Sequence, residues 1–450
     1  MTATRFPSPF RIAASLALAL SLSACAGGLF GGGGGKKSTP TVGNRVPILS
    51  RIETGAKIDP ALAGVAVALP AAQANTEWAQ TGGSASKATG HFALGAAPQR
   101  VWTAQIAGST QRVRLASAPV VGDGRLYAVG SDGAISAFDA STGARLWVHT
   151  ADVASELRNA VFGGGVSFAS GKVYATNGTG EVTALDAATG AQLWKVKPAG
   201  PLRGAPTVDF GSLYAMTQDN QIVALEAATG KLQWQESAAA TASGVFGVAA
   251  PAAAQGTVIA GYSSGELVAY RYENGRTLWA DALARTNIST QVGSLTDIDA
   301  DPIIDGGRVF ALGQGGRMAA YELVTGQRIW ELNLAGISTP ALAGDWIFTL
   351  TDDARLLAIA RASGKVRWIS QLSRYRDEED KKGPIFWQGP VLAGDSLWVV
   401  NSDGQLWRVS PGDGSATMFT EFKQPISLAP IVANRTLYIL DDSGRITALR

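Results

Sequence analysis

Short runs in which apolar and polar residues alternate recur along most of this chain, and a tight turn ends each run. Residues 116–150 show the pattern once, as ASAPVVGDG, RLYAVGSDG, AISAFDASTG and ARLWVHT. Alternation with a period of two predicts β-strands with one buried face. The Asp-Gly and Thr-Gly pairs supply the positive φ that tight hairpins need. This stretch therefore predicts four antiparallel strands in succession.

The third and fourth runs contain a phrase that returns along the chain with small edits. AFDASTGARLW ends at Trp147 and ALDAATGAQLW at Trp194; later copies follow at intervals of 38 to 51 residues, and the last ends at Met418 instead of a tryptophan. Such a period is typical of β-propeller blades, because one copy cannot bury its own apolar face. Since the tryptophans follow the repeat, we interpret them as packing residues between blades rather than ligand platforms. These blade tryptophans are Trp102, Trp147, Trp194, Trp234, Trp279, Trp330 and Trp368.

The number of blades and the way the ring closes follow from the ends of the array. First strands are expected near residues 118, 165, 205, 250, 301, 339, 389 and 429, and a proline opens all but the second. The last copy holds only three strands, whereas QRVWTAQI, at 99–106, is a fourth-strand phrase without a copy of its own. A ring must remove its open edges. The sequence therefore predicts an all-β fold: an eight-bladed β-propeller of four-stranded antiparallel blades over residues 96–450, closed by pairing of this N-terminal strand with the last blade.

The first part of the chain has the features of a bacterial lipoprotein. Residues 1–24 carry two arginines, no acidic residue and the apolar run IAASLALALSL, which predicts a signal peptide. Leu22-Ser23-Ala24-Cys25 matches a lipobox, and Cys25 is the only cysteine, so we expect acylation at Cys25. Residues 25–95 are predicted to be a lipidated flexible tether because GGLFGGGGGKKSTPT is glycine-rich.

Two parts of this tether have no clear pattern. The sequence leaves open whether residues 46–80 pack on the propeller or run free, and it suggests that residues 76–83 lie along the outer side of the ring.

Composition and motifs argue against several classes of function. The chain has 38 basic and 36 acidic residues, and removal of Arg5 and Arg11 with the signal peptide leaves the charges balanced, which argues against a nucleic-acid partner. The two histidines, His91 and His149, have no metal-ligand spacing, and no zinc motif is present. We predict no metal, no cofactor and no catalytic residue.

The A-x-D-x-x-T-G-x-x-x-W phrase resembles the repeat of pyrroloquinoline-quinone-dependent dehydrogenases. That resemblance implies a quinone bound with calcium, an active-site aspartate and a disulfide of adjacent cysteines, which a single cysteine cannot form. The lipobox, the tether and the eight predicted blades together are more similar to the outer-membrane protein assembly factor BamB family. This second resemblance implies a non-enzymatic scaffold subunit of the outer-membrane β-barrel assembly (BAM) complex, anchored by lipid to the outer membrane and facing the periplasm.

The BamB resemblance also implies partners and a binding face. Two stretches resemble family segments: GPLRGAPTVDFGSLYA, at 200–215, and VGSLTDIDADPIIDGGRVFAL, at 292–312. In the family these loops dock on a periplasmic POTRA domain of BamA. The matching residues are Leu202, Arg203, Asp297 and Asp299, and we expect an exposed Leu202 beside Arg203 to form the anchor. The alternatives are that Leu202 packs under its loop and that the two aspartates only shape turns.

Other partners and two other functions remain open from the sequence alone. The expected partners include the other BAM subunits, the membrane and nascent outer-membrane proteins, and exclude nucleic acid. The alternatives are a periplasmic quinoprotein-type oxidoreductase and, more weakly, a propeller that binds polysaccharide or peptidoglycan.

Overall fold

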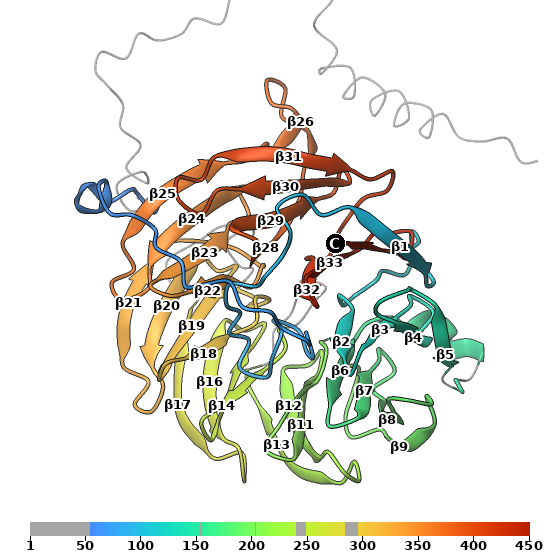
Figure 1. Cartoon of the computed structure of the whole chain (residues 1–450). Coiled ribbons are helices and arrows are strands. Elements are labelled where there is room, and N and C mark those ends of the chain that lie inside the picture. Colours follow the sequence, from blue (N-terminus) through green and yellow to red (C-terminus); the bar gives the residue numbers. More distant parts are fainter. Residues whose placement is uncertain (1–54, 151, 154, 203, 240–248, 284–295) are drawn as a thin grey trace, which may run out of the picture. The chain divides into compact units, whose positions relative to one another are not determined.

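The computed structural model describes residues 55–150, 152–153, 155–202, 204–239, 249–283 and 296–450. All of them lie in one compact unit, Glu53–Arg450. In this described part, eight four-stranded antiparallel sheets stand as blades around a common axis, and a short hairpin and two 3-10 helices accompany them (Figure 1). The predicted all-β, eight-bladed propeller is confirmed.

The first four blades each run outward from an innermost strand, so that strand order in the sheet follows strand order in the sequence. Blade 1 is β2 (Val120–Gly122), β3 (Arg125–Val129), β4 (Ile135–Asp139) and β5 (Arg145–His149). Blade 2 is β6 (Val166–Ala169), β7 (Lys172–Thr176), β8 (Val182–Asp186) and β9 (Gln192–Val196). Blade 3 is β10 (Thr207–Asp209), β11 (Ser212–Met216), β12 (Gln221–Glu226) and β13 (Leu232–Ser237). Blade 4 is β14 (Ala252–Ala254), β15 (Thr257–Gly261), β16 (Glu266–Arg271) and β17 (Thr277–Ala282).

The other four blades repeat this arrangement, with the hairpin β26 (Tyr375–Asp377) and β27 (Lys382–Pro384) between blades 6 and 7. Blade 5 is β18 (Ile303–Asp305), β19 (Arg308–Gly313), β20 (Arg317–Glu322) and β21 (Arg328–Leu332). Blade 6 is β22 (Ala341–Ala343), β23 (Trp346–Leu350), β24 (Arg355–Ala360) and β25 (Val366–Gln371). Blade 7 is β28 (Trp387–Ala393), β29 (Ser396–Asn401), β30 (Gln405–Val409) and β31 (Ala416–Glu421). Blade 8 is β32 (Ile431–Ala433), β33 (Thr436–Leu440), β34 (Arg445–Leu449) and β1 (Arg100–Gln105). The 3-10 helices are η1 (Pro60–Leu62) and η2 (Ser155–Ala160).

The ring closes in blade 8 as the sequence predicts. Strand β1 pairs antiparallel with β34, with Trp102 opposite Ala448, and β1 thereby becomes the outer strand of the last blade. Backbone hydrogen bonds of 2.7 and 2.8 Å between Gln99 and Arg450 extend this pairing by one residue. Closure removes the open edge that three strands alone would leave.

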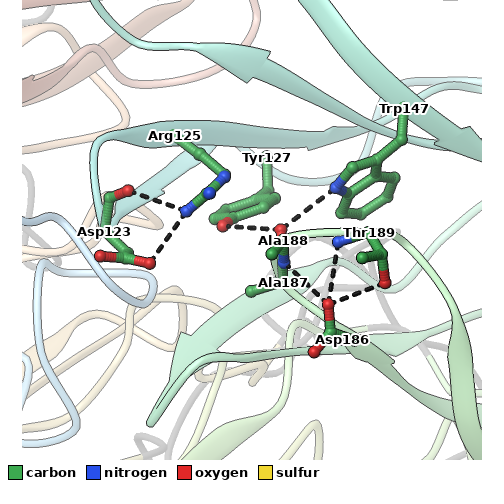
Figure 2. Close-up of polar contacts among 8 residues, drawn as sticks. All are labelled: Asp123, Arg125, Tyr127, Trp147, Asp186, Ala187, Ala188 and Thr189. Carbon is green, nitrogen blue, oxygen red and sulfur yellow. Dashed lines mark hydrogen bonds and ion pairs between the residues drawn. The ribbon is translucent and has the colours of Figure 1, made fainter.

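Each blade tryptophan joins its blade to the next one. In blade 1, the Trp147 indole Nε1–H donates to the carbonyl of Ala187, in the turn after β8 of blade 2, at 3.1 Å, and the Tyr127 hydroxyl donates to the same carbonyl (Figure 2). Gly190 in that turn has a φ of 74°, and a Cβ there would lie 2.6 Å from Cδ2 of Trp147. The glycine of the repeat is therefore required both by the turn and by the indole that covers it.

The aspartate of the repeated phrase shapes the turn that receives the indole. The carboxylate of Asp186 accepts hydrogen bonds from the Thr189 hydroxyl and from the backbone N–H groups of Thr189 and Ala188 (Figure 2). These donors, the Thr189 hydroxyl first, lower the pKa of Asp186. The turn is thus held in one shape, which fixes the position of the carbonyl at Ala187.

The same indole-to-carbonyl bond recurs around the ring, except between blades 7 and 8. The other donors and acceptors are Trp102 and Ala140, Trp194 and Ala227, Trp234 and Tyr272, Trp279 and Leu323, Trp330 and Arg361, and Trp368 and Pro411. In blade 8 the third and fourth strands, β34 and β1, come from opposite ends of the propeller sequence, so no tight turn joins them. The equivalent position of blade 7 is Met418, which is 47% exposed.

Prolines precede the innermost strands as expected, with one difference. Pro119, for example, stands directly before β2, where the missing N–H costs no ladder hydrogen bond. Pro390 instead lies inside β28, which begins earlier, at Trp387. The register shifts between Gln388 and Val391, and this irregularity accommodates the proline.

A segment before the first blade, residues 73–95, fills the centre of the ring, and we refer to it as the axial segment. Trp78 and Val121 of β2 exchange two backbone hydrogen bonds of 2.8 and 2.9 Å, and the Phe92 carbonyl accepts from Gly394, just after β28. Blades 2, 4, 5 and 8 are reached in the same way, through Ala79, Ala85, Ser86 and Asn75, and blade 3 through the Gln80 side chain. In Figure 1 this blue segment crosses the middle of the ring.

The axial segment pairs with the inner strand edges, which no neighbouring strand covers within a blade. Unpaired backbone groups in a closed interior are costly, and one irregular chain can satisfy those of several blades at once. The structure therefore differs from the flexible tether predicted over 25–95, because residues 55–95 belong to the propeller unit. The suggestion that residues 76–83 lie along the outer side of the ring is wrong: they lie at its axis.

Candidate partner-binding face and axial funnel

The segments that lead into the innermost strands surround a funnel at one end of the ring axis. The funnel is a cavity of about 660 Å³. Its walls come from blade 1 and from blades 3 to 8, and its floor from Trp78, Thr81, Gly82 and Thr89 of the axial segment.

A set of polar contacts joins this floor to the funnel wall. The Lys87 side chain is fully buried and its Nζ donates to the Thr81 hydroxyl at 3.1 Å. Asp301, which lines the funnel, accepts from the Ala250 N–H at 2.8 Å. Burial lowers the pKa of Lys87 to about 8, against the opposing attraction of Asp301, and burial raises the pKa of Asp301, against the attraction of Lys87. The two charges support each other, and they tie the axial segment to blades 4 and 5.

Other polar groups of the funnel wall bond to one another. The Ser338 hydroxyl lies 3.2 Å from the Gln388 amide oxygen, and the Thr339 hydroxyl accepts from the backbone N–H of Asp301 at 3.0 Å. The Ser117 hydroxyl donates to the carbonyl of Ala118 at 3.0 Å. These bonds hold the funnel in shape, whereas Arg114 is exposed at the wall and the buried Thr89 hydroxyl has no hydrogen-bond partner among the described residues.

The mouth of the funnel exposes large apolar side chains. Phe386, next to the hairpin β26–β27, is 66% exposed, and Ile337, before β22, is 37% exposed; both line the cavity. The hairpin itself carries the charged sequence of residues 374–382, and its Arg376 pairs with Asp403 at 2.5 Å. The sequence does not predict the funnel, because no local pattern marks residues that meet only around an axis.

The structure places Leu202 in the core. It is fully buried, forms a bridge with Thr217 and packs among apolar residues of blades 2 and 3, including Tyr174 and Val223. The expectation of an exposed leucine anchor is therefore wrong. The loop before β10 folds this side chain inward because the gap between the two blades offers an apolar site.

The two predicted acidic residues differ from each other. Asp297 is fully buried, and its backbone carbonyl accepts from the N–H of Gln314 at 2.8 Å. Asp299 lines the funnel together with Gly204 and Ala205, which follow Leu202 closely. The loops before β10 and β18 thus border the same funnel, two blades apart. Arg203 and Cys25 lie outside the described residues.

Among the described residues, no group of three or more His, Cys, Asp or Glu side chains is arranged to hold a metal ion. Within those residues there is also no helix with the length and apolar character needed to cross a membrane. His91 is buried, with Nδ1 2.8 Å from the carbonyl of Pro70 and Nε2 3.4 Å from a carboxylate oxygen of Asp395. This histidine links the axial segment to blade 7.

The ring and its repeat define a class of protein, the eight-bladed β-propellers in which a repeated tryptophan joins one blade to the next. A quinohemoprotein alcohol dehydrogenase from Comamonas testosteroni shares this fold, with a TM-score of 0.65 and 14% identity over 83% of this chain and 80% of the other. BamB from Moraxella catarrhalis shares it too, with a TM-score of 0.66 and 21% identity over 78% of this chain and 99% of the other. At these identities the likeness shows the fold alone.

The family follows from the sequence matches. The family model described as outer membrane protein assembly factor BamB matches residues 87–161 and 131–370. The protein of that name from Salmonella typhimurium is 27% identical over 207 residues, and the one from Escherichia coli K12 is 25% identical over 207 residues; each match spans 45% of this chain and 50% of the relative. The chain thus aligns with about half the length of these relatives. It belongs to the outer membrane protein assembly factor BamB family.

Proposed function

We infer that this protein is a non-enzymatic scaffold subunit of the outer-membrane β-barrel assembly machinery, which binds BamA and helps outer-membrane proteins to fold and insert. The observation that carries this inference is the family match across residues 87–370, which covers blades 1 to 5 and reaches the last strand of blade 6. The described part of the funnel supports a binding role, because it exposes the apolar side chains of Phe386 and Ile337 around a concave surface.

The docking face consists of the loops before β10 and β18, at the funnel end of the ring. Arg203 supplies the anchor of this face, and Asp299 supplies an acidic group two blades away. Leu202 and Asp297 are buried, so they act by holding their loops in shape rather than by touching the partner. A partially desolvated arginine pair at such a face can contribute roughly 2–5 kcal/mol, whereas a charge at the rim contributes little.

The protein acts at the periplasmic side of the outer membrane. Its signal peptide, residues 1–24, directs export, and acyl chains on Cys25 anchor it. Residues between the lipid and residue 55 form the tether, and residues 55–95 belong to the propeller. The other BAM subunits are the expected neighbours in the complex.

A quinone-dependent oxidoreductase is the weaker alternative. Pyrroloquinoline quinone is a tricarboxylate that such enzymes hold with calcium, so its site needs accessible cations and a set of acidic ligands. Of the described basic residues that could serve, Arg114 is exposed at the wall and Lys87 is enclosed below the floor. The described residues also lack a metal-ligand group. The alternative is tested by recording the absorbance of the purified protein after reconstitution with the quinone and calcium, where we expect no spectrum of a bound quinone.

Co-purification from detergent-solubilised membranes tests the proposal. Arg203→Glu should reduce recovery of BamA at least about tenfold, as expected when a desolvated arginine pair is lost. Arg435→Glu is the matched control, since Arg435 is exposed in the turn between β32 and β33, at the other end of the innermost strands. Asp299→Ala should have a smaller effect. Equal recovery of BamA with Arg203→Glu and Arg435→Glu would show that the loops before β10 and β18 do not form the docking face.

A further inference from the structure

One fully buried carboxylate has no partner. Asp297 lies in the segment before β18, and neither of its carboxylate oxygens has a hydrogen-bond partner among the residues that the structure describes. Donors beside it are already used: the Thr296 hydroxyl donates to the carbonyl of Ser263 at 2.9 Å, and the Ile298 N–H donates to the carbonyl of Tyr262. An ionised carboxylate without a partner is costly to bury, so a proton or a cation must compensate it.

A second acceptor without a partner lies on the neighbouring backbone. Gln314, in the turn between β19 and β20, has a buried amide oxygen that accepts no hydrogen bond within the described part of the chain. Its backbone N–H donates to the Asp297 carbonyl at 2.8 Å, so the two residues lie side by side. The basic residue after this turn, Arg317, has its Nε 3.6 Å from a carboxylate oxygen of Glu331 on β21. Three acceptor oxygens on adjoining backbones therefore lack a donor.

A cation satisfies these oxygens more completely than a proton does. A protonated Asp297 can donate to the Gln314 amide oxygen, but its other carboxylate oxygen still lacks a partner. A cation can contact all three oxygens at once, and it also neutralises the carboxylate. Carboxylate and amide oxygens are ligands that calcium prefers, and calcium accepts flexible coordination that water molecules complete.

We propose that the Asp297 carboxylate and the Gln314 amide oxygen bind a calcium ion, which ties the segment before β18 to the turn between β19 and β20. This site does not depend on the proposed function. It differs from a cluster of three or more acidic, histidine or cysteine side chains, which the described residues lack, because only one of its ligands is charged. A single carboxylate gives weak binding, so we expect a Kd of roughly 10⁻⁴–10⁻³ M, as in extracellular calcium modules.

Isothermal titration calorimetry of the purified full-length protein with calcium chloride, after dialysis against a chelator, tests the proposal. Asp297→Asn keeps the shape of the side chain and removes its charge, so it should raise the Kd at least about tenfold. Gln314→Glu adds a second carboxylate at the same place and should lower the Kd about tenfold, because the number of charged ligands sets calcium affinity.

Asp132→Asn is the matched control. Asp132 is exposed in the turn between β3 and β4 of blade 1, which is the equivalent of the turn that carries Gln314. The Kd of this variant should stay within about twofold of the unsubstituted protein, because the two turns lie in different blades. Equal calcium affinity of Asp297→Asn and Asp132→Asn would overturn the proposal.

Thermal unfolding distinguishes a bound cation from a proton. Calcium should raise the thermal midpoint of the unsubstituted protein and leave that of Asp297→Asn unchanged. In the absence of calcium, Gln314→Glu should be less stable than the unsubstituted protein because two carboxylates are buried together, and calcium should reverse this loss. If calcium moved no midpoint, and Asp297→Asn were as stable as the unsubstituted protein, Asp297 would be a protonated core residue and the proposal would be wrong.

Discussion

Replacing Trp279 should show how much each tryptophan contributes to the ring. Its indole is 9% exposed at the seam between blades 4 and 5, where Nε1–H donates to the Leu323 carbonyl at 2.8 Å. The ring also stacks on Tyr321 with centroids 5.5 Å apart. Trp279→Ala removes all three contributions, and we expect a loss of about 3–5 kcal/mol in the free energy of unfolding.

Two further variants divide this loss into its parts. Trp279→Phe keeps an aromatic ring but leaves the Leu323 carbonyl without its donor, so it should cost about 1–2 kcal/mol. Met418→Ala is the control at the equivalent place in blade 7, where the residue is 47% exposed and no turn receives it. Its cost should stay below about 1 kcal/mol.

The assay is urea unfolding followed by far-ultraviolet circular dichroism, because tryptophan fluorescence would itself change with these substitutions. Hydrogen exchange read by mass spectrometry adds the location: Trp279→Ala should speed exchange first in the turn after β20. If Met418→Ala cost as much as Trp279→Ala, the indole-to-carbonyl bond would not explain the stability of the seams. If the Trp279→Phe variant were as stable as the unsubstituted protein, the hydrogen bond from the indole to the Leu323 carbonyl would make no measurable contribution to the free energy of unfolding.

Three more outcomes follow from the sequence and the packing. Cys25→Ala should fail to incorporate labelled palmitate and should retain its signal peptide; normal labelling would end the lipidation hypothesis. Deleting residues 26–54 should leave the thermal midpoint of the propeller unchanged, whereas extending the deletion through residue 95 should lower it strongly, because the inner strand edges lose their partners; equal midpoints would contradict the role of the axial segment. The pKa of Lys87 is about 8 in the folded protein and 10.5 for a lysine free in water, so the unfolded chain binds more protons between these values and stability should rise as pH increases from 8 to 10.5. Lys87→Met should remove this rise in urea titrations at each pH, and a rise that persists in the variant would assign it to other groups.

The blades were predictable because each one is a local pattern repeated many times. Strand alternation, the Thr-Gly turn and the tryptophan all lie within one copy, so each copy supports the interpretation of the others. The closing strand was predictable as well, since QRVWTAQI carries the fourth-strand signature and the last copy lacks one. All of these features are patterns of side-chain type along the chain, and such patterns can be read directly from the sequence.

The centre of the ring was not predictable for the opposite reason. The axial segment binds mainly through backbone groups, such as those of Trp78 and Ala85, and therefore needs no periodic side chains. The funnel joins residues from seven blades and the axial segment, which become neighbours only once the ring exists. The burial of Leu202 depends on a gap between two blades, and an isolated leucine in a loop gives no sign of it.

Because β1 pairs with β34, the ring closes only after the last strand of the propeller has been synthesised. Synthesis produces β1 before any strand of the blade that it finishes, so it must remain without its partner until β34 has been made. A chain interrupted anywhere between them keeps an open edge at blade 8, available for aggregation or for degradation. Only a chain that has reached β34 can cover the open edge of β1, so the last strand to be synthesised is the one that completes the ring.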